Sequence, residues 1–171
     1  MIIVVPKEIM EGENRVAIVP EVASKLIKKG FEIFMEKDAG IRAGFPDEKY
    51  LNAGVKILQD VVELYSKADI VLKVQRPINH PSLSKHELEL MKKGTTLISF
   101  FYSLHYPEIA KRAAELGINV ISMDAIPRTT LAQRMDALSS QANIAGYKSV
   151  ILAANYLHKI FPMMMTAAGT I

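Results

Sequence analysis

Polar side chains that could orient a charged ligand gather in one short stretch in the second half of the chain. They comprise two arginines, an amide, a carboxylate and a hydroxyl: Arg128, Arg134, Gln133, Asp136 and Ser139. A helix that begins at Asp136 would place Ser139, three residues later, on the same face. Capping and the helix dipole both favour a carboxylate at such a start. The set suits a ligand with a carboxamide and negative charge, such as a nicotinamide dinucleotide; a capped helix beside a solvated loop is the simpler alternative, which these residues alone leave open.

Three further places follow runs of β-branched residues, where an open α/β sheet binds its ligands. Arg15 follows the first run and carries the planar fork that grips a carboxylate or phosphate, although its position favours a surface ion pair. Lys73, Gln75 and Arg76 follow the fourth run, and we expect them to face one cleft. Asp124 ends the sixth run and opens the polar loop described above.

Other kinds of site find no support in the sequence. The nucleotide-cradling patterns G-x-G-x-x-G and G-x-x-x-x-G-K-[ST] are absent, as are H-E-x-x-H and G-x-S-x-G. The chain has no cysteine, and its four histidines are scattered without the spacing that would place two on one helix face. We therefore expect structural roles for the histidines, no metal site and no pair of carboxylates for acid/base catalysis.

Composition describes an ordinary globular chain. With 171 residues, 50% of them hydrophobic and 23% charged, it is long enough for one domain with a substantial core. A net charge of +3 is too small to indicate nucleic-acid binding. No apolar stretch approaches the 18 or so residues of a membrane-spanning helix, so we expect no direct membrane insertion and no secretion.

The elements that must position these groups alternate regularly. Runs rich in β-branched residues predict six strands, at 2–5, 31–36, 55–58, 69–74, 96–100 and 119–123. Between them, apolar residues three and four apart predict helices, and Gly30 and Gly117 stand where a helix would end. This alternation predicts an α/β fold, Rossmann-like (flavodoxin-like), with a mostly parallel sheet, flanking helices and right-handed crossovers.

One long helix is expected after the polar loop, over 136–161. Small residues recur along it at steps of three and four: Ser139, Ala142, Gly146, Ser149 and Ala153. Such a stripe lets another backbone approach closely, as in tight helix pairs, although small residues can also be simple fillers.

Two segments carry a family resemblance. The stretch PRTTLAQRMDALSSQANIAGYK at 127–148, followed by PMMMTAAGT at 162–170, resembles the NAD(H)-binding first domain of proton-translocating nicotinamide nucleotide transhydrogenase. The opening Pro6-Lys-Glu with Asn14-Arg-Val-Ala is similar to the wider group that includes alanine dehydrogenase. The resemblance covers essentially the whole chain, and the stretch at 128–147 is its most specific segment.

The resemblance implies hydride transfer between NAD(H) and NADP(H), coupled to proton movement through a separate membrane component. It implies NAD(H) as cofactor of the complete domain, contacted by Arg128, Gln133, Met135, Asp136 and Ser139, in a positioning role without a catalytic proton donor. NADP(H) would be bound by a partner domain. The implied partners are the NADP(H)-binding and membrane-spanning subunits and a second copy of this chain, and the implied location is cytoplasmic, at the membrane surface.

The chain departs from the family pattern at Leu131, where a second arginine is common, and at Arg134, where a small polar residue is common. Both departures bear on partner docking. The resemblance also divides the chain into an α/β subdomain at 1–135, a connecting helix at 136–161 and the start of a truncated dinucleotide-binding subdomain at 162–171. Since the glycine-rich fold that holds the pyrophosphate would follow, we expect this chain alone to bind NAD(H) weakly or not at all.

Two alternatives remain open. An alanine dehydrogenase-like oxidoreductase shares Arg15, but its pyruvate-binding lysine falls at Gln75 and its catalytic histidine has no counterpart in Ser99-Phe-Phe-Tyr-Ser. A non-catalytic interaction module with the same fold is the other.

Overall fold

A computed structural model describes residues 1–161, 163, 165–167 and 169–170. The chain forms two compact units, residues 1–126 (unit 1) and 127–171 (unit 2). The subdomain boundaries expected at 135 and 161 remain a prediction.

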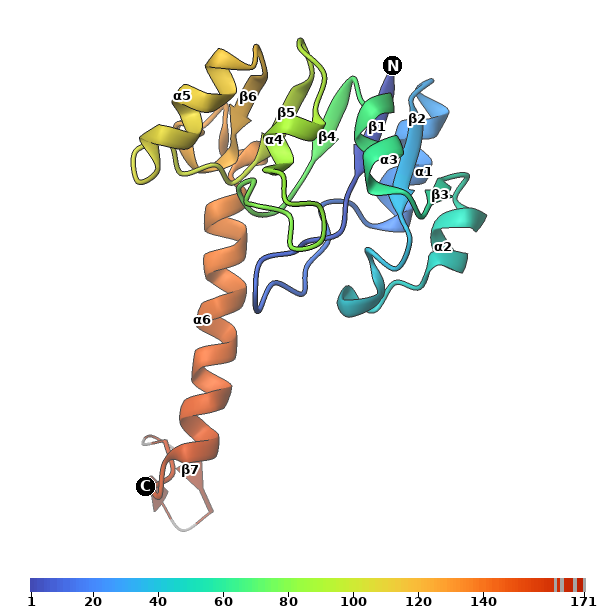
Figure 1. Cartoon of the computed structure of the whole chain (residues 1–171). Helices are drawn as coiled ribbons and strands as arrows, with labels where there is room; N and C mark the ends of the chain where they lie inside the picture. The colour runs from blue at the N-terminus through green and yellow to red at the C-terminus, as the bar shows by residue number, and fades with distance from the viewer. Residues whose placement is uncertain (162, 164, 168, 171) are drawn as a thin grey trace. The chain divides into compact units, whose positions relative to one another are not determined.

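Unit 1 is built on a six-stranded sheet (Figure 1). Its strands are β1 (Ile2–Val5), β2 (Glu32–Glu36), β3 (Lys56–Leu58), β4 (Ile70–Leu72), β5 (Thr96–Ser99) and β6 (Asn119–Ser122). They lie in the order β3-β2-β1-β4-β5-β6, and every pairing is parallel. The direction of winding reverses between β1 and β4, which is the topological switch point of a doubly wound sheet.

Five helices connect the strands: α1 (Pro20–Lys28), α2 (Asp47–Asn52), α3 (Val61–Lys67), α4 (Glu87–Leu90) and α5 (Pro107–Glu115). Side chains of α1 and α2 pack with Ile3 and Val5 on one face of the sheet. Side chains of α3, α4 and α5 pack with Val4 and Leu97 on the other face. Successive strand residues point to opposite faces, so the buried run of β1 supplies both cores.

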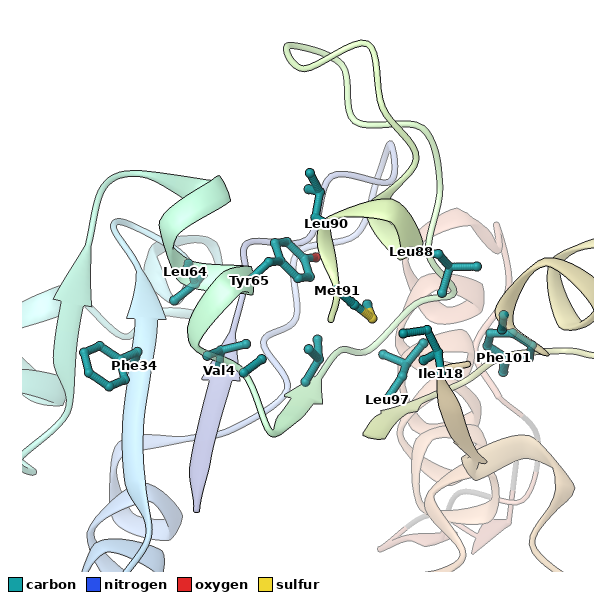
Figure 2. Close-up of a cluster of buried hydrophobic side chains, with 13 residues drawn as sticks. Val4, Phe34, Leu64, Tyr65, Leu88, Leu90, Met91, Leu97, Phe101 and Ile118 are labelled. Carbon is teal, nitrogen blue, oxygen red and sulfur yellow. The ribbon is translucent and has the colours of Figure 1, made fainter. Parts of the chain in front are cut away.

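The core under α3 and α4 is shown in Figure 2. Leu64, Tyr65 and Leu88 are fully buried there, with Val4 and Leu97 from the strands. Burial of each of the leucine and valine side chains among them stabilises the fold by roughly 1.5–3 kcal/mol. This packing fixes the strands whose carboxyl ends carry the polar groups.

Local sequence explains where several helices begin and end. Pro20 opens α1, a position where its missing N–H costs nothing, and the Asp60 side chain caps α3 by accepting hydrogen bonds from Val62 N and Glu63 N. Gly30 and Gly117 each follow the C-cap residue of a helix, Lys29 after α1 and Leu116 after α5, with φ of 91° and 69°. Their left-handed backbone is the reason that glycine stands there.

Unit 2 contains the 3₁₀ helix η3 (Gln133–Met135), the helix α6 (Ala137–Tyr156) and the short antiparallel pair β7 (Met165–Thr166) and β8 (Gly169–Thr170). From Ala142 to Tyr156 every residue of α6 is exposed. Within the described residues, no helix is both long and apolar enough to cross a membrane.

The predicted α/β fold, with its six strands and parallel sheet, is confirmed. Two details differ. The sequence pattern did not predict α2, a short helix whose only buried residue is Tyr50. The long helix ends at Tyr156 rather than at 161, because Leu157 turns to an extended conformation. Of the three methionines at 163–165, Met164 lies outside the described residues.

Candidate functional site at residues 127–139

Asp136 and Ser139 meet at the start of α6. Asp136 caps the helix: its Oδ1 accepts a hydrogen bond from Ser139 N at 2.9 Å, and its Oδ2 accepts one from Ser139 Oγ at 2.5 Å. These two bonds, with a smaller contribution from the positive charge of Arg128, hold the pKa of Asp136 below its ordinary value. Asp136 is therefore ionised at neutral pH and presents an oriented carboxylate beside a hydroxyl.

The other predicted residues of this segment are exposed. Arg128, Gln133 and Met135 are all solvent-accessible, and Gln133 opens the 3₁₀ helix that leads into Asp136. Backbone hydrogen bonds fold the segment on itself, from Gln133 N to Thr129 O at 3.1 Å and from Asp136 N to Gln133 O at 3.3 Å. The structure thus brings Asp136, Ser139 and the charge of Arg128 together, and presents Gln133 and Met135 on the same short turn.

Chemically, this segment can pair with a carboxamide. A carboxamide needs a donor for its oxygen and an acceptor for its NH₂ group, and the Gln133 amide and the Asp136–Ser139 pair provide both. Arg128 adds a fixed positive charge that suits a phosphate or another anion.

A second polar group lies at the carboxyl end of the sheet, around Glu13. Arg15 grips the Glu13 carboxylate through Nε at 2.8 Å and Nη2 at 2.6 Å, and Gln75 Nε2 donates to the same carboxylate at 2.7 Å. The hydrogen bonds from Arg15, as the largest cause, lower the pKa of Glu13 to about 2. Arg15 therefore forms an ion pair, as its position favoured, and the partner is an internal carboxylate.

The expectation that Lys73, Gln75 and Arg76 face one cleft is wrong. The side chain of Lys73 is only 1% exposed, and its Nζ lies 2.7 Å from Glu87 Oε1 and 3.6 Å from Glu8 Oε2. A charged ammonium group is rarely buried without such partners. Lys73 can therefore be buried because the carboxylates of Glu8 and Glu87 lie beside its Nζ. Arg76 instead lays its guanidinium over the Tyr106 ring, 3.9 Å from the ring centroid.

The two carboxylates around Lys73 were not predicted from the sequence. Glu8 also accepts hydrogen bonds from Val74 N at 2.6 Å and Gln75 N at 3.3 Å, and Glu87 accepts one from the Tyr65 hydroxyl at 2.8 Å. Burial is the main cause that raises the pKa of Glu8. Burial alone would lower the pKa of Lys73, but Glu87 and Glu8 outweigh it and the pKa is raised. The signal that could have indicated Glu8 and Glu87 is the buried lysine itself, because a buried ammonium group needs acidic partners.

Asp124 lies at the carboxyl end of the sheet as predicted, but its carboxylate serves the chain itself. Its Oδ1 accepts hydrogen bonds from Phe101 N at 2.6 Å, Tyr102 N at 3.1 Å and Ser122 Oγ at 2.7 Å. Among the residues that the structure describes, no group of three or more His, Asp or Glu side chains could hold a metal ion.

A parallel sheet in the order β3-β2-β1-β4-β5-β6, with helices on both faces, defines a doubly wound α/β domain. The chain belongs to the alanine dehydrogenase/PNT family: residues 4–145 match the family model described as "Alanine dehydrogenase/PNT, N-terminal domain".

Named relatives agree with this assignment. The chain is 45% identical over 166 residues to the NAD(P) transhydrogenase subunit alpha of Cereibacter sphaeroides, covering 97% of this chain and 31% of the relative. It superimposes on the crystal structure of transhydrogenase from Sinorhizobium meliloti with a TM-score of 0.86 and 37% identity, covering 100% of this chain and 49% of that one. An L-alanine dehydrogenase structure matches with a TM-score of 0.82 and 28% identity over 99% of this chain and 46% of that one. The chain therefore spans less than half the length of each of these relatives.

Proposed function

We propose that this chain is the opening portion of an NAD(H)-binding domain in a proton-translocating NAD(P) transhydrogenase. The observation that carries the proposal is the Asp136–Ser139 pair with the charge of Arg128 beside it, in a chain 45% identical to a named transhydrogenase subunit. Hydride transfer would run between NAD(H) and NADP(H).

In this proposed function the residues of this chain orient the nicotinamide ring and take no chemical part in hydride transfer. Gln133 and the Asp136–Ser139 pair would hold the carboxamide, which fixes the rotation of the nicotinamide ring, and Arg128 would hold negative charge nearby. Met135 would supply an apolar contact. The bound nucleotide supplies the transferable hydride, so no proton donor from this chain is required.

We also propose that two copies associate through α6 and that NADP(H)-binding and membrane-spanning subunits complete the assembly, at the cytoplasmic surface of a membrane. Support for association comes from the apolar side chains that α6 exposes, among them Ile144, Tyr147, Val150 and Ile151. A helix that exposes this much apolar surface is ordinarily covered.

An alanine dehydrogenase activity fits the structure less well. The Arg15 fork and the Gln75 amide are both engaged by Glu13, and the solved alanine dehydrogenase is the more distant of the two structural relatives, at 28% against 37% identity. The second alternative is a non-catalytic interaction module that keeps the fold without using a cofactor. Binding of a nicotinamide nucleotide would exclude it.

The test is calorimetric titration with NADH and with NADPH, of this chain and of the full natural polypeptide that contains it. We expect NADH to bind the longer form selectively, and Gln133→Ala and Asp136→Ala to weaken that binding at least tenfold. Glu21→Gln, which removes only an exposed ion pair to Lys25, is the matched control and should bind like the wild type.

An activity assay distinguishes a transhydrogenase from an alanine dehydrogenase. The longer form, combined with its NADP(H)-binding and membrane subunits, should reduce NAD⁺ at the expense of NADPH. Alanine-dependent reduction of NAD⁺ without those subunits would contradict the proposal and establish the alternative.

A further inference from the structure

We propose that Glu8 is a proton-operated latch: its ionised carboxylate holds the loop between β1 and α1 against the segment after β4, and protonation of Glu8 releases that loop. The loop comprises residues 6–19 and the segment comprises residues 73–78, so the whole latch lies inside unit 1. Both follow strands that flank the topological switch point of the sheet. The latch goes beyond the proposed function, because its operation requires no bound nucleotide.

The latch consists of contacts between one buried side chain and the segment after β4. Glu8 Oε1 accepts a hydrogen bond from Val74 N at 2.6 Å, and Glu8 Oε2 accepts one from Gln75 N at 3.3 Å. Lys73 Nζ lies 3.6 Å from Glu8 Oε2. The Glu8 side chain is only 3% exposed, so these groups stand where water would otherwise solvate the carboxylate. One side chain thus joins two segments that are more than 60 residues apart in the sequence.

The three partners of Glu8 fit a carboxylate and do not fit a carboxylic acid. All three are donors, since two are backbone N–H groups and the third is an ammonium group. An ionised carboxylate only accepts hydrogen bonds, whereas a protonated one must donate from one of its oxygens. The remaining bonds would also weaken, because hydrogen bonds to a charged acceptor are the stronger ones. Protonation of Glu8 therefore loosens its contacts with Val74, Gln75 and Lys73 together.

The loop is built to open between one tie that responds to protons and one that does not. Glu11 and Gly12 are exposed, and Gly12 has a left-handed backbone with φ of 77°. Glu13, whose pKa is about 2, stays ionised and keeps the far end of the loop in its ion pair. Arg42 also donates to the backbone oxygens of Glu8 and Glu13, in both cases at 3.3 Å, which is beyond the usual range for such bonds.

Charged and titratable groups approach Glu8 from each element around it. They are Lys73 after β4, Glu87 of α4, Tyr65 of α3, Glu36 of β2, Arg42 after β2, and Glu13 and Arg15 of the same loop. Burial, with a smaller contribution from the negative charge of Glu87, raises the pKa of Glu8 even though Lys73 lies beside it. Glu8 therefore titrates above its ordinary 4.5, before acid reaches Glu13.

The sign of this shift means that opening is not unfolding. The folded state binds the Glu8 proton more tightly than the unfolded state does, because a protonated Glu8 no longer places a negative charge in the interior. The contribution of Glu8 to the free energy of unfolding therefore rises as the pH falls through this window, above pH 4.5. The loop can open while the rest of unit 1 stays folded.

Hydrogen exchange followed by mass spectrometry tests the latch in the natural polypeptide that contains this chain. Rates are measured from about pH 8 to about pH 4.5 and corrected for the intrinsic pH dependence of exchange. We expect protection at 8–15 and 74–78 to fall at least about tenfold on acidification, the loss that corresponds to one hydrogen bond to a charged group. Protection in α1 and α2 should stay constant. Glu8→Gln, which is neutral and has nearly the same shape, should show the low protection at every pH.

Asp47→Asn is the matched control, because the Asp47 carboxylate also accepts a backbone N–H from another segment, Asp38 N at 3.0 Å. It should lower protection around residue 38 and leave the pH profile at 8–15 and 74–78 unchanged. A control that abolishes that profile as Glu8→Gln does would overturn the proposal.

Glu87→Gln keeps the test decisive if Glu8→Gln does not fold. Without the negative charge of Glu87, the pKa of Glu8 falls, so the midpoint of the opening should move to lower pH. The proposal is overturned if the wild-type profile is flat over this range, if Glu8→Gln retains the wild-type profile, or if Glu87→Gln leaves the midpoint where it was.

Discussion

Glu13 and Arg15 form a two-pronged ion pair inside one loop: Arg15 Nε lies 2.8 Å from Oε1 and Nη2 lies 2.6 Å from Oε2. Arg15 N donates to Oε1 as well, at 2.9 Å, and Gln75 reaches Oε2 from β4's carboxyl end. The Glu13 carboxylate thus receives four donors and ties the loop after β1 to the segment after β4. Such bidentate geometry depends on the planar guanidinium.

Replacing Arg15 by lysine keeps the charge and removes the fork. We expect a loss of about 1 kcal/mol in the free energy of unfolding, modest because the arginine side chain is partly exposed. Urea denaturation measures it, with Lys25→Arg at the exposed pair with Glu21 as a control that should change little. An Arg15→Lys chain as stable as the wild type would show that the fork contributes nothing.

Acid should destabilise the fold through Glu13. Its pKa is lowered from the ordinary 4.5 to about 2, so the folded state favours the ionised form. The stability that this contributes is fully present above about pH 4.5 and is lost as the pH falls toward 2. Thermal melts between pH 6 and pH 2.5 should show a shallower decline for Glu13→Gln than for the wild type, and parallel curves would refute this.

Lys73→Met removes the only cation placed between Glu8 and Glu87 among the described ion pairs. Two buried carboxylates would then face each other uncompensated, and we expect a loss of about 3–5 kcal/mol. Lys25→Met, at an exposed pair, should lose no more than about 0.5 kcal/mol.

A double variant keeps this test informative if Lys73→Met does not fold. Lys73→Met with Glu87→Gln carries one buried charge fewer and should recover some of the lost stability in urea denaturation. No recovery would mean that packing around the lysine stem, and not charge, accounts for the effect.

An added methyl group should change the free energy of unfolding in opposite directions at two glycines, Gly40 and Gly146. A Cβ at Gly40 would lie 2.5 Å from Tyr50 Cε2 and 2.6 Å from Phe45 O, so Gly40→Ala should cost about 1–3 kcal/mol. A Cβ at Gly146, in α6, meets nothing within 4 Å, so Gly146→Ala should stabilise the helix by about 0.5–1 kcal/mol. Denaturation followed by circular dichroism measures both, and equal effects would contradict the geometry.

Association through α6 predicts that a charge on its apolar surface separates the copies. Ile151 is 44% exposed in the single chain, and Ile151→Lys should shift the mass measured by light scattering toward that of a monomer. Leu131→Lys, at a residue 89% exposed and outside the helix, is the control and should leave the mass unchanged. A wild-type chain that is monomeric at tens of micromolar would refute association by this helix.

Most of unit 1 could be predicted because its elements are periodic. The runs around Ile3 and Val71 are apolar throughout, as expected for strands buried on both faces, and the glycines at 30 and 117 mark helix ends. By contrast α2 has a single buried anchor, Tyr50, which leaves no pattern to detect.

The polar contacts were harder to predict than the elements. Asp136 and Ser139 are neighbours on one helix, so their spacing alone indicated the pair. Glu8, Lys73 and Glu87 come from three separate segments, and only the folded sheet brings them together. For the same reason Lys73 was placed in a cleft, since sequence shows that a residue follows a strand but not which way it turns.

The position of β1 has a consequence for synthesis on the ribosome. Ile3 pairs with Ile33 on one side and with Ile70 on the other, so β1, the earliest of these six strands along the chain, is also a central one. At about 5–20 residues per second, its second neighbour emerges on the order of 3–13 s later. During that interval one hydrogen-bonding edge of Ile2–Val5 is open, and an open apolar edge of this kind can pair with other chains until β4 arrives.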